Sequence, residues 1–92
     1  MGRIVITHST YIEGLIPKLK KIAAEDDVKS VIPGEIKRSK GKSNSFKLKI
    51  SAIIRGGYKL IARKGKSLQE VFIITKLERE VLERLVQECE ID

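Results

Sequence analysis

Alternation of apolar and polar residues predicts several strands along the chain. It is clearest over residues 46–55, where apolar residues from Phe46 to Ile54 occupy the even positions and Lys47 and Lys49 lie between them. Residues 2–8 alternate in the same way, which places His8 on the apolar side of a first strand. Residues 71–74 are apolar at every position, as is typical of an inner strand covered on both faces.

Helical spacing of apolar residues predicts two helices. The first begins near Gly14 or Leu15 and runs to about Glu25, with Pro17 in its first turn, where a missing N–H costs little. The second continues from Leu77 to the C-terminus, and Thr75 and Glu78 have the spacing of a capping box before it.

The connections between these elements carry the remaining predictions. Residues 28–36 predict a short edge strand that bends at Pro33 and Gly34, and residues 37–45 predict a loop. Residues 55–57 predict a three-residue hairpin loop that pairs Ile54 with Tyr58 and sets Lys49 opposite Arg63. Two cations in that position repel, and an anion between them would relieve the repulsion.

The order of elements is therefore β-α-β-β-β-β-α. It favours an α+β fold of two layers, a mainly antiparallel sheet with two helices packed on one face and lysines on the other. At 92 residues the chain is expected to form one domain, residues 1–92. Its apolar runs are too short to span a membrane, and it carries one cysteine, so we expect a cytoplasmic protein without an intrachain disulfide.

Positive charge is concentrated in residues 37–66. This window holds eleven of the nineteen Lys and Arg residues and none of the twelve Asp and Glu residues, so it accounts for the whole formal charge of +7. Segregated positive charge on a small protein is typical of a surface that binds polyphosphates such as nucleic acid.

Two copies of Lys-Gly-Lys-Ser, residues 40–43 and 64–67, lie in this window. A glycine between two cations lets backbone N–H groups and ammonium groups hold an anion at a turn, although each copy alone is also an ordinary turn sequence. Neither is a nucleotide-binding P-loop, because Ile36 and Leu60 stand where that motif requires glycine. The sequence does not support nucleotide hydrolysis.

The expected ligand is structured RNA or a duplex, because aromatic residues for stacking single-stranded bases are few and Phe46 and Phe72 fit core positions. The cations predicted to contact phosphates, as charge donors rather than base readers, are Lys40, Lys42, Lys47, Lys49, Arg55, Lys59, Arg63, Lys64 and Lys66.

Candidate chemistry centres on His8, Ser9 and Glu13, at the predicted turn between the first strand and the first helix. A lone histidine on the apolar side of a strand is more often structural, and Cys89 fits the apolar stripe of the last helix. One histidine and one cysteine cannot complete a tetrahedral zinc site without carboxylates, so we expect no cofactor, with His8 the only candidate metal ligand.

Two longer segments, residues 8–17 and 55–72, resemble a family of small archaeal and cyanobacterial proteins of unknown function labelled "predicted metal-binding protein". The similarity extends over nearly the whole chain. The resemblance implies no assigned catalytic residues, and it draws attention to His8 and to the hairpin between Arg55 and Phe72.

Three hypotheses follow from the sequence. The first is a small basic nucleic-acid-binding module for structured RNA, which acts through phosphate contacts. The second is a metal-dependent or phosphate-recognising enzyme centred on His8; the residues favour a binding protein over an enzyme. The third is an adaptor or homodimer whose basic face docks on acidic protein surface.

Overall fold

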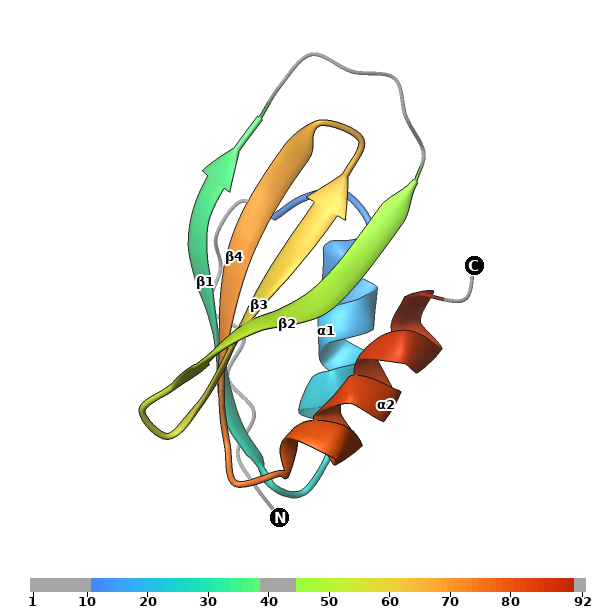
Figure 1. Ribbon diagram of the computed structural model, residues 1–92. Helices are drawn as coiled ribbons and strands as arrows, with labels where there is room; N and C mark the ends of the chain where they lie inside the picture. Colours follow the sequence, from blue (N-terminus) through green and yellow to red (C-terminus); the bar gives the residue numbers. More distant parts are fainter. Residues whose placement is uncertain (1–10, 39–44, 91–92) are drawn as a thin grey trace.

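The computed structural model describes residues 11–38 and 45–90, with side chains through Glu88. The described chain forms two helices and four strands (Figure 1). In chain order they are α1 (Leu15–Ala23), β1 (Val28–Lys37), β2 (Phe46–Ile54), β3 (Gly57–Lys64), β4 (Ser67–Thr75) and α2 (Arg79–Glu90).

All neighbouring strands are antiparallel, and their order across the sheet is β1-β4-β3-β2. Both helices cover the same face of this sheet (Figure 1), where α1 contacts β1 and α2 contacts β2. The predicted α+β fold is thereby confirmed for the described residues, with β4 inside the sheet as expected. The strand predicted over residues 2–8 lies outside the described residues. Neither described helix is long and apolar enough to cross a membrane.

The core lies between the sheet and the helices. Leu48, Leu60, Val71 and Ile73 from the sheet are completely buried. The helices contribute their apolar stripes, with Leu15, Leu19, Ile22 and Leu82 also completely buried. Burying these side chains supplies the main favourable term in folding.

Helix α1 begins at Leu15, within the predicted range. Gly14 precedes it with φ +86°, a left-handed conformation that side-chain-bearing residues rarely adopt, and Pro17 is its third residue. Strand β1 is an edge strand, as predicted, but at ten residues it is longer than expected. Its pairing with β4 shifts between Pro33 and Ile36, where the sequence placed the bend.

The β2–β3 hairpin differs from the prediction in its register. Ile54 pairs with Gly57 rather than Tyr58, because Gly56 takes φ +81° and a two-residue loop suffices. The register shifts once more between Ile50 and Ala52, which leaves Ser51 as an extra residue. Lys49 therefore lies opposite Ile61, and Lys47 lies opposite Arg63. The predicted pairing of Lys49 with Arg63 is wrong by two residues.

The shorter turn and the extra residue Ser51 each shift the pairing by one residue, which makes two in all. Residues 46–50 and their partners in β3 therefore keep the faces that the sequence predicted. Leu48 and Ala62 point into the core, and Lys47 and Lys49 point away from the helices. Between Ser51 and the turn, the single shift reverses the faces. Ala52 is paired with Lys59 on the outer face, where the sequence had placed it in the core.

We call the side of the sheet away from the helices the open face. Phe72 lies on it, because it pairs with Lys59 and Ile32 while its neighbours Val71 and Ile73 are buried in the core. The prediction that Phe72 is a core residue is wrong, whereas Phe46 packs against the core. No described element covers the open face, so the apolar run of β4 does not reflect a second helical layer.

The predicted capping box does not form. Helix α2 begins at Arg79, and the Glu78 carbonyl accepts its first hydrogen bond, from the Leu82 N–H. The Thr75 hydroxyl instead accepts from the Leu77 N–H at 3.1 Å and donates to the Asp27 carbonyl at 2.8 Å. It thereby joins the end of β4 to the segment before β1.

Candidate anion-binding surface

Three cations from β2 and β3 meet on the open face. Lys47 and Arg63 are direct partners across the two strands, and Lys49 follows on the same face of β2. Together with Ser45 and Ile61 they line a cavity of about 230 Å³. We call Lys47, Lys49 and Arg63 the basic patch. All three are exposed.

No described carboxylate forms an ion pair with a cation of the basic patch, and Glu83 of α2 lines a neighbouring cavity together with Lys49. No acidic side chain lines the cavity of the basic patch itself. Directly opposed residues on antiparallel strands have Cβ atoms about 4.5–5.5 Å apart, so Lys47 and Arg63 repel each other. An anion bound between them would remove this repulsion.

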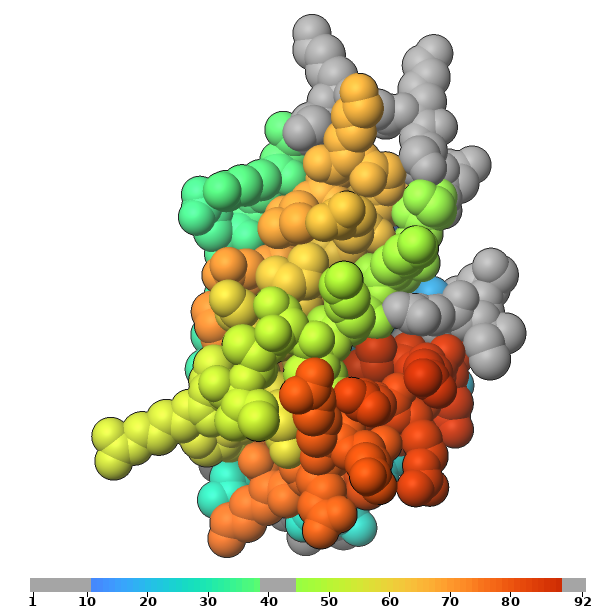
Figure 2. All heavy atoms as spheres, in the orientation of Figure 1, coloured from blue at the N-terminus to red at the C-terminus, as the bar shows by residue number. Residues whose placement is uncertain are grey.

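Lys59 lies on the same open face but has a partner. Its Nζ is 3.8 Å from Oε1 of Glu70, a diagonal contact between β3 and β4. Figure 2 shows the side chains of the edge strand β2 running between those of the neighbouring strands and the helix α2. The unpaired charge of this face therefore gathers near the start of β2 and the end of β3.

Arg63 and Lys64 are consecutive residues of β3, so their side chains leave opposite faces of the sheet. Lys64 points to the helix side, where its Nζ lies 3.7 Å from Oε2 of Glu13 and 3.4 Å from the Glu13 carbonyl oxygen. The β3–β4 turn that follows is tied to β2 by a 3.2 Å bond from the Gly65 N–H to the Ser45 carbonyl. Lys66 is exposed on that turn.

The predicted site residues thus separate into groups. Arg55 lies in the β2–β3 turn, at the opposite end of the hairpin from Lys64 and Lys66. Lys40 and Lys42 lie outside the described residues, so the first Lys-Gly-Lys-Ser segment is not placed. Of the three candidates for chemistry, His8 and Ser9 also lie outside the described part. Glu13 is brought to Lys64 rather than to Arg55 or Lys59.

A buried glutamine missed by the sequence analysis positions Glu13. Gln69 of β4 is completely buried, and its Oε1 accepts a 2.9 Å hydrogen bond from the Ile12 N–H. This bond anchors the segment before α1 to the sheet. Gln69 shares its side of the strand with Val71 and Ile73, and a polar residue on that apolar side was the signal that could have identified it.

The sequence comparisons give a family and no individual relative. The family described as "Predicted metal-binding protein (DUF2103)" matches residues 1–90. No curated protein and no solved structure matches the chain.

The family description implies a metal site, and the described side chains can be searched for ligands that would form one. The chain's single histidine, His8, and the side chain of Cys89 lie outside them. Within the described part, no three His, Cys, Asp or Glu side chains gather closely enough to hold a metal ion. The described residues therefore do not fit a metal centre.

Proposed function

The chain belongs to the predicted metal-binding family DUF2103, and we propose that it is a nucleic-acid-binding module that recognises structured RNA through its phosphates. The observation that carries this proposal is the basic patch on the open face. Lys47, Lys49 and Arg63 come together there beside Ser45, without an acidic residue among the side chains that line the cavity. As part of this proposal, the protein acts in the cytoplasm.

The chemistry of the basic patch suits phosphate. Arg63 offers a planar fork of N–H donors that matches phosphate oxygens, and the two lysines add point charges around it. Each phosphate neutralised in this way releases condensed counterions, which is the main source of affinity in contacts that do not read bases. Pairing between β2 and β3 fixes the main chain of the three residues, so mainly the freedom of their side chains is lost on binding.

The composition of the open face favours contacts to the backbone of the nucleic acid over stacking on bases. Phe72 is the one aromatic residue that the described register places there, and it is half-buried beside Gly34 and Lys59. Recognition of single-stranded bases usually relies on several exposed rings. The open face thus suits the regular phosphate array of a helical RNA.

Lys66 on the β3–β4 turn extends the positive surface around the end of the sheet, and Lys64, the last residue of β3, adds charge on the helix side, where Glu13 partly offsets it. Lys59 contributes less in this proposal, because Glu70 already offsets its charge. Arg55 would contact only a ligand long enough to reach the far end of the hairpin. Lys40 and Lys42 remain proposed contacts on the basis of the sequence.

The test is a binding titration with an RNA hairpin and a DNA duplex, both without terminal phosphates, across a series of salt concentrations. The test protein carries Lys47→Gln, Lys49→Gln and Arg63→Gln. The control carries Lys20→Gln, Lys21→Gln and Arg84→Gln, which remove the same charges from exposed positions of the helices. Thermal unfolding of both proteins shows that each is folded.

The wild type should bind with an affinity that falls steeply as salt increases. Each phosphate contact contributes about 0.9 to the slope of log affinity against log salt for duplex DNA, so the patch variant should lose about 2–3 from this slope. The control should keep most of it. Absence of binding at low salt, affinity that ignores salt, or equal losses in the two variants would each overturn the proposal.

A further inference from the structure

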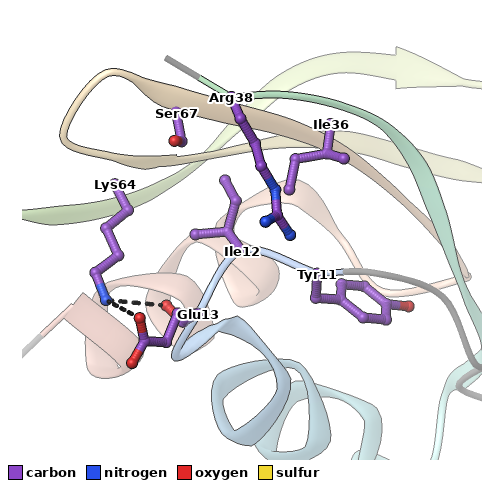
Figure 3. Close-up of a pocket in the computed structure, with 7 residues that line it drawn as sticks. All are labelled: Tyr11, Ile12, Glu13, Ile36, Arg38, Lys64 and Ser67. Atoms are coloured by element: carbon purple, nitrogen blue, oxygen red, sulfur yellow. Dashed lines mark hydrogen bonds and ion pairs between the residues drawn. The ribbon is translucent and has the colours of Figure 1, made fainter. Parts of the chain in front are cut away.

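A second cavity lies on the helix side of the sheet, between the segment before α1, the end of β1 and the β3–β4 turn (Figure 3). Its volume is about 260 Å³. Arg38, Lys64 and Ser67 supply its polar donors, and Ile12 and Ile36 supply apolar wall. We call it the α1–turn cavity. It is separate from the basic patch, because Lys64 and Arg63 leave opposite faces of β3.

The two cations approach this cavity from different elements. Arg38 follows β1 and Lys64 ends β3, and Figure 3 shows the two side chains on either side of Ile12. Ser67, the first residue of β4, completes the second Lys-Gly-Lys-Ser segment above them. The glycine of that segment, Gly65, takes φ +59°, which lets the chain turn between the lysine and the serine.

Glu13 is the anion that now occupies part of this site. Its carboxylate lies 3.7 Å from the Lys64 Nζ, longer than the distance of about 2.7–2.9 Å typical of a charge-assisted hydrogen bond. The Glu13 side chain is 92% exposed and the Lys64 side chain 28% exposed. A long contact to so exposed a carboxylate holds weakly. No described carboxylate forms an ion pair with Arg38.

We propose that the α1–turn cavity binds a phosphate monoester, which displaces the Glu13 carboxylate from Lys64. A monoester carries close to two negative charges at neutral pH, so it competes well against a single carboxylate. Once released from Glu13, the Lys64 side chain would turn towards the phosphate from one side of Ile12 and Arg38 from the other, and the Ser67 hydroxyl would donate to a third oxygen. Ile12 and Ile36 would contact the first carbons of the esterified group.

The same chemistry is offered by the terminal phosphate of an RNA strand and by a small phosphorylated metabolite. Isothermal titration with inorganic phosphate, glycerol 3-phosphate and a short RNA with or without a 5′-phosphate separates these sources. Binding of all three phosphate-bearing probes means general monoester recognition. Tighter binding of the short RNA when it carries the 5′-phosphate, without binding of the two small molecules, means recognition of an RNA end, because the basic patch binds both forms of the RNA. Both results support a monoester site, provided that the variants behave as follows.

Arg38→Gln and Lys64→Gln should each weaken binding of the probe at least tenfold, because each removes one of the two charges. Glu13→Gln should strengthen it about two- to fivefold, because the competing carboxylate is gone and an exposed ion pair is worth at most a small factor. Glu80→Gln removes an exposed carboxylate of the first turn of α2 and should change the affinity less.

In the variant with three substitutions in the basic patch, the affinity for inorganic phosphate and glycerol 3-phosphate, or the gain that a 5′-phosphate gives the short RNA, should stay within about twofold of the wild type. This separates the inference from the proposed function, since RNA hairpins without terminal phosphates carry no phosphate monoester. The inference is overturned if no probe binds, if Arg38→Gln binds like the wild type, or if Glu13→Gln has no more effect than Glu80→Gln. Loss of phosphate binding in the basic-patch variant would also overturn it.

Discussion

Replacing Gln69 with leucine tests how the segment before α1 is held on the sheet. Gln69 is completely buried and Ile12 is 4% exposed, and the Ile12 N–H donates to Oε1 of Gln69 at 2.9 Å. Leucine has a similar volume, so Gln69→Leu leaves little cavity, but it offers no acceptor. The buried N–H would then lose its partner without gaining water.

An unsatisfied buried donor costs about 1–3 kcal/mol. For a domain of this size each kcal/mol lowers the melting temperature by roughly 4–8 °C, so we expect a decrease of roughly 5–20 °C. Total stabilities of about 5–15 kcal/mol are usual, so the variant should still fold. Urea and thermal unfolding measure the change, and hydrogen exchange of the Ile12 amide reports the anchor itself.

Gln87→Leu is the matched control, because Gln87 is exposed on α2. It should change the free energy of unfolding by no more than about 0.5 kcal/mol. If Gln69→Leu is as stable as Gln87→Leu, and exchange at Ile12 is not accelerated, then the hydrogen bond is not the anchor. The reasoning that Gln69 positions Glu13 beside Lys64 would then fail.

Two further substitutions test the hairpin. Gly57→Ala should destabilise the protein by about 2–3 kcal/mol or more, because its Cβ would overlap the main-chain carbonyl of Ile73. Gly56→Ala, at φ +81° and with only an ordinary contact to Ile74, should cost about 1–2 kcal/mol. The opposite ranking in urea unfolding would contradict the register. Tyr58→Phe removes the 2.8 Å bond from the tyrosine hydroxyl to the Leu77 carbonyl and should cost about 0.5–1.5 kcal/mol; unchanged stability would show that this bond does not help to hold the segment before α2.

Most of the described fold could be predicted from periodicity. The stripes of α1 and α2 and the alternation of β2 as far as Ile50 each reflect which side of an element is buried, and the sequence records this directly. The inner position of β4 was also predicted, although only one face of that strand is covered by helices. The register of the hairpin could not be predicted in the same way. A two-residue and a three-residue loop both suit the Arg55-Gly56-Gly57 segment, and the choice depends on Gly57 packing against Ile73 of a strand further along the chain.

The candidate sites, too, could be predicted from the sequence only in part. The window of positive charge was evident in the sequence, but its separation into the basic patch and the α1–turn cavity depends on the opposite directions of Arg63 and Lys64. Arg38 was not predicted to contact phosphate, because nothing local in the sequence shows that the end of β1 lies beside the β3–β4 turn. Gln69 was missed because its partner, the Ile12 N–H, is fifty-seven residues away.

NMR chemical-shift mapping is the sharpest test of whether the basic patch binds nucleic-acid phosphates. The wild type is titrated with an RNA hairpin that lacks a terminal phosphate. If the basic patch is the binding surface, the largest shifts should fall at residues 45–49 and 61–63, with small shifts on the exposed sides of α1 and α2. No shifts at low salt, or shifts concentrated on the helices with residues 45–49 unaffected, would contradict it.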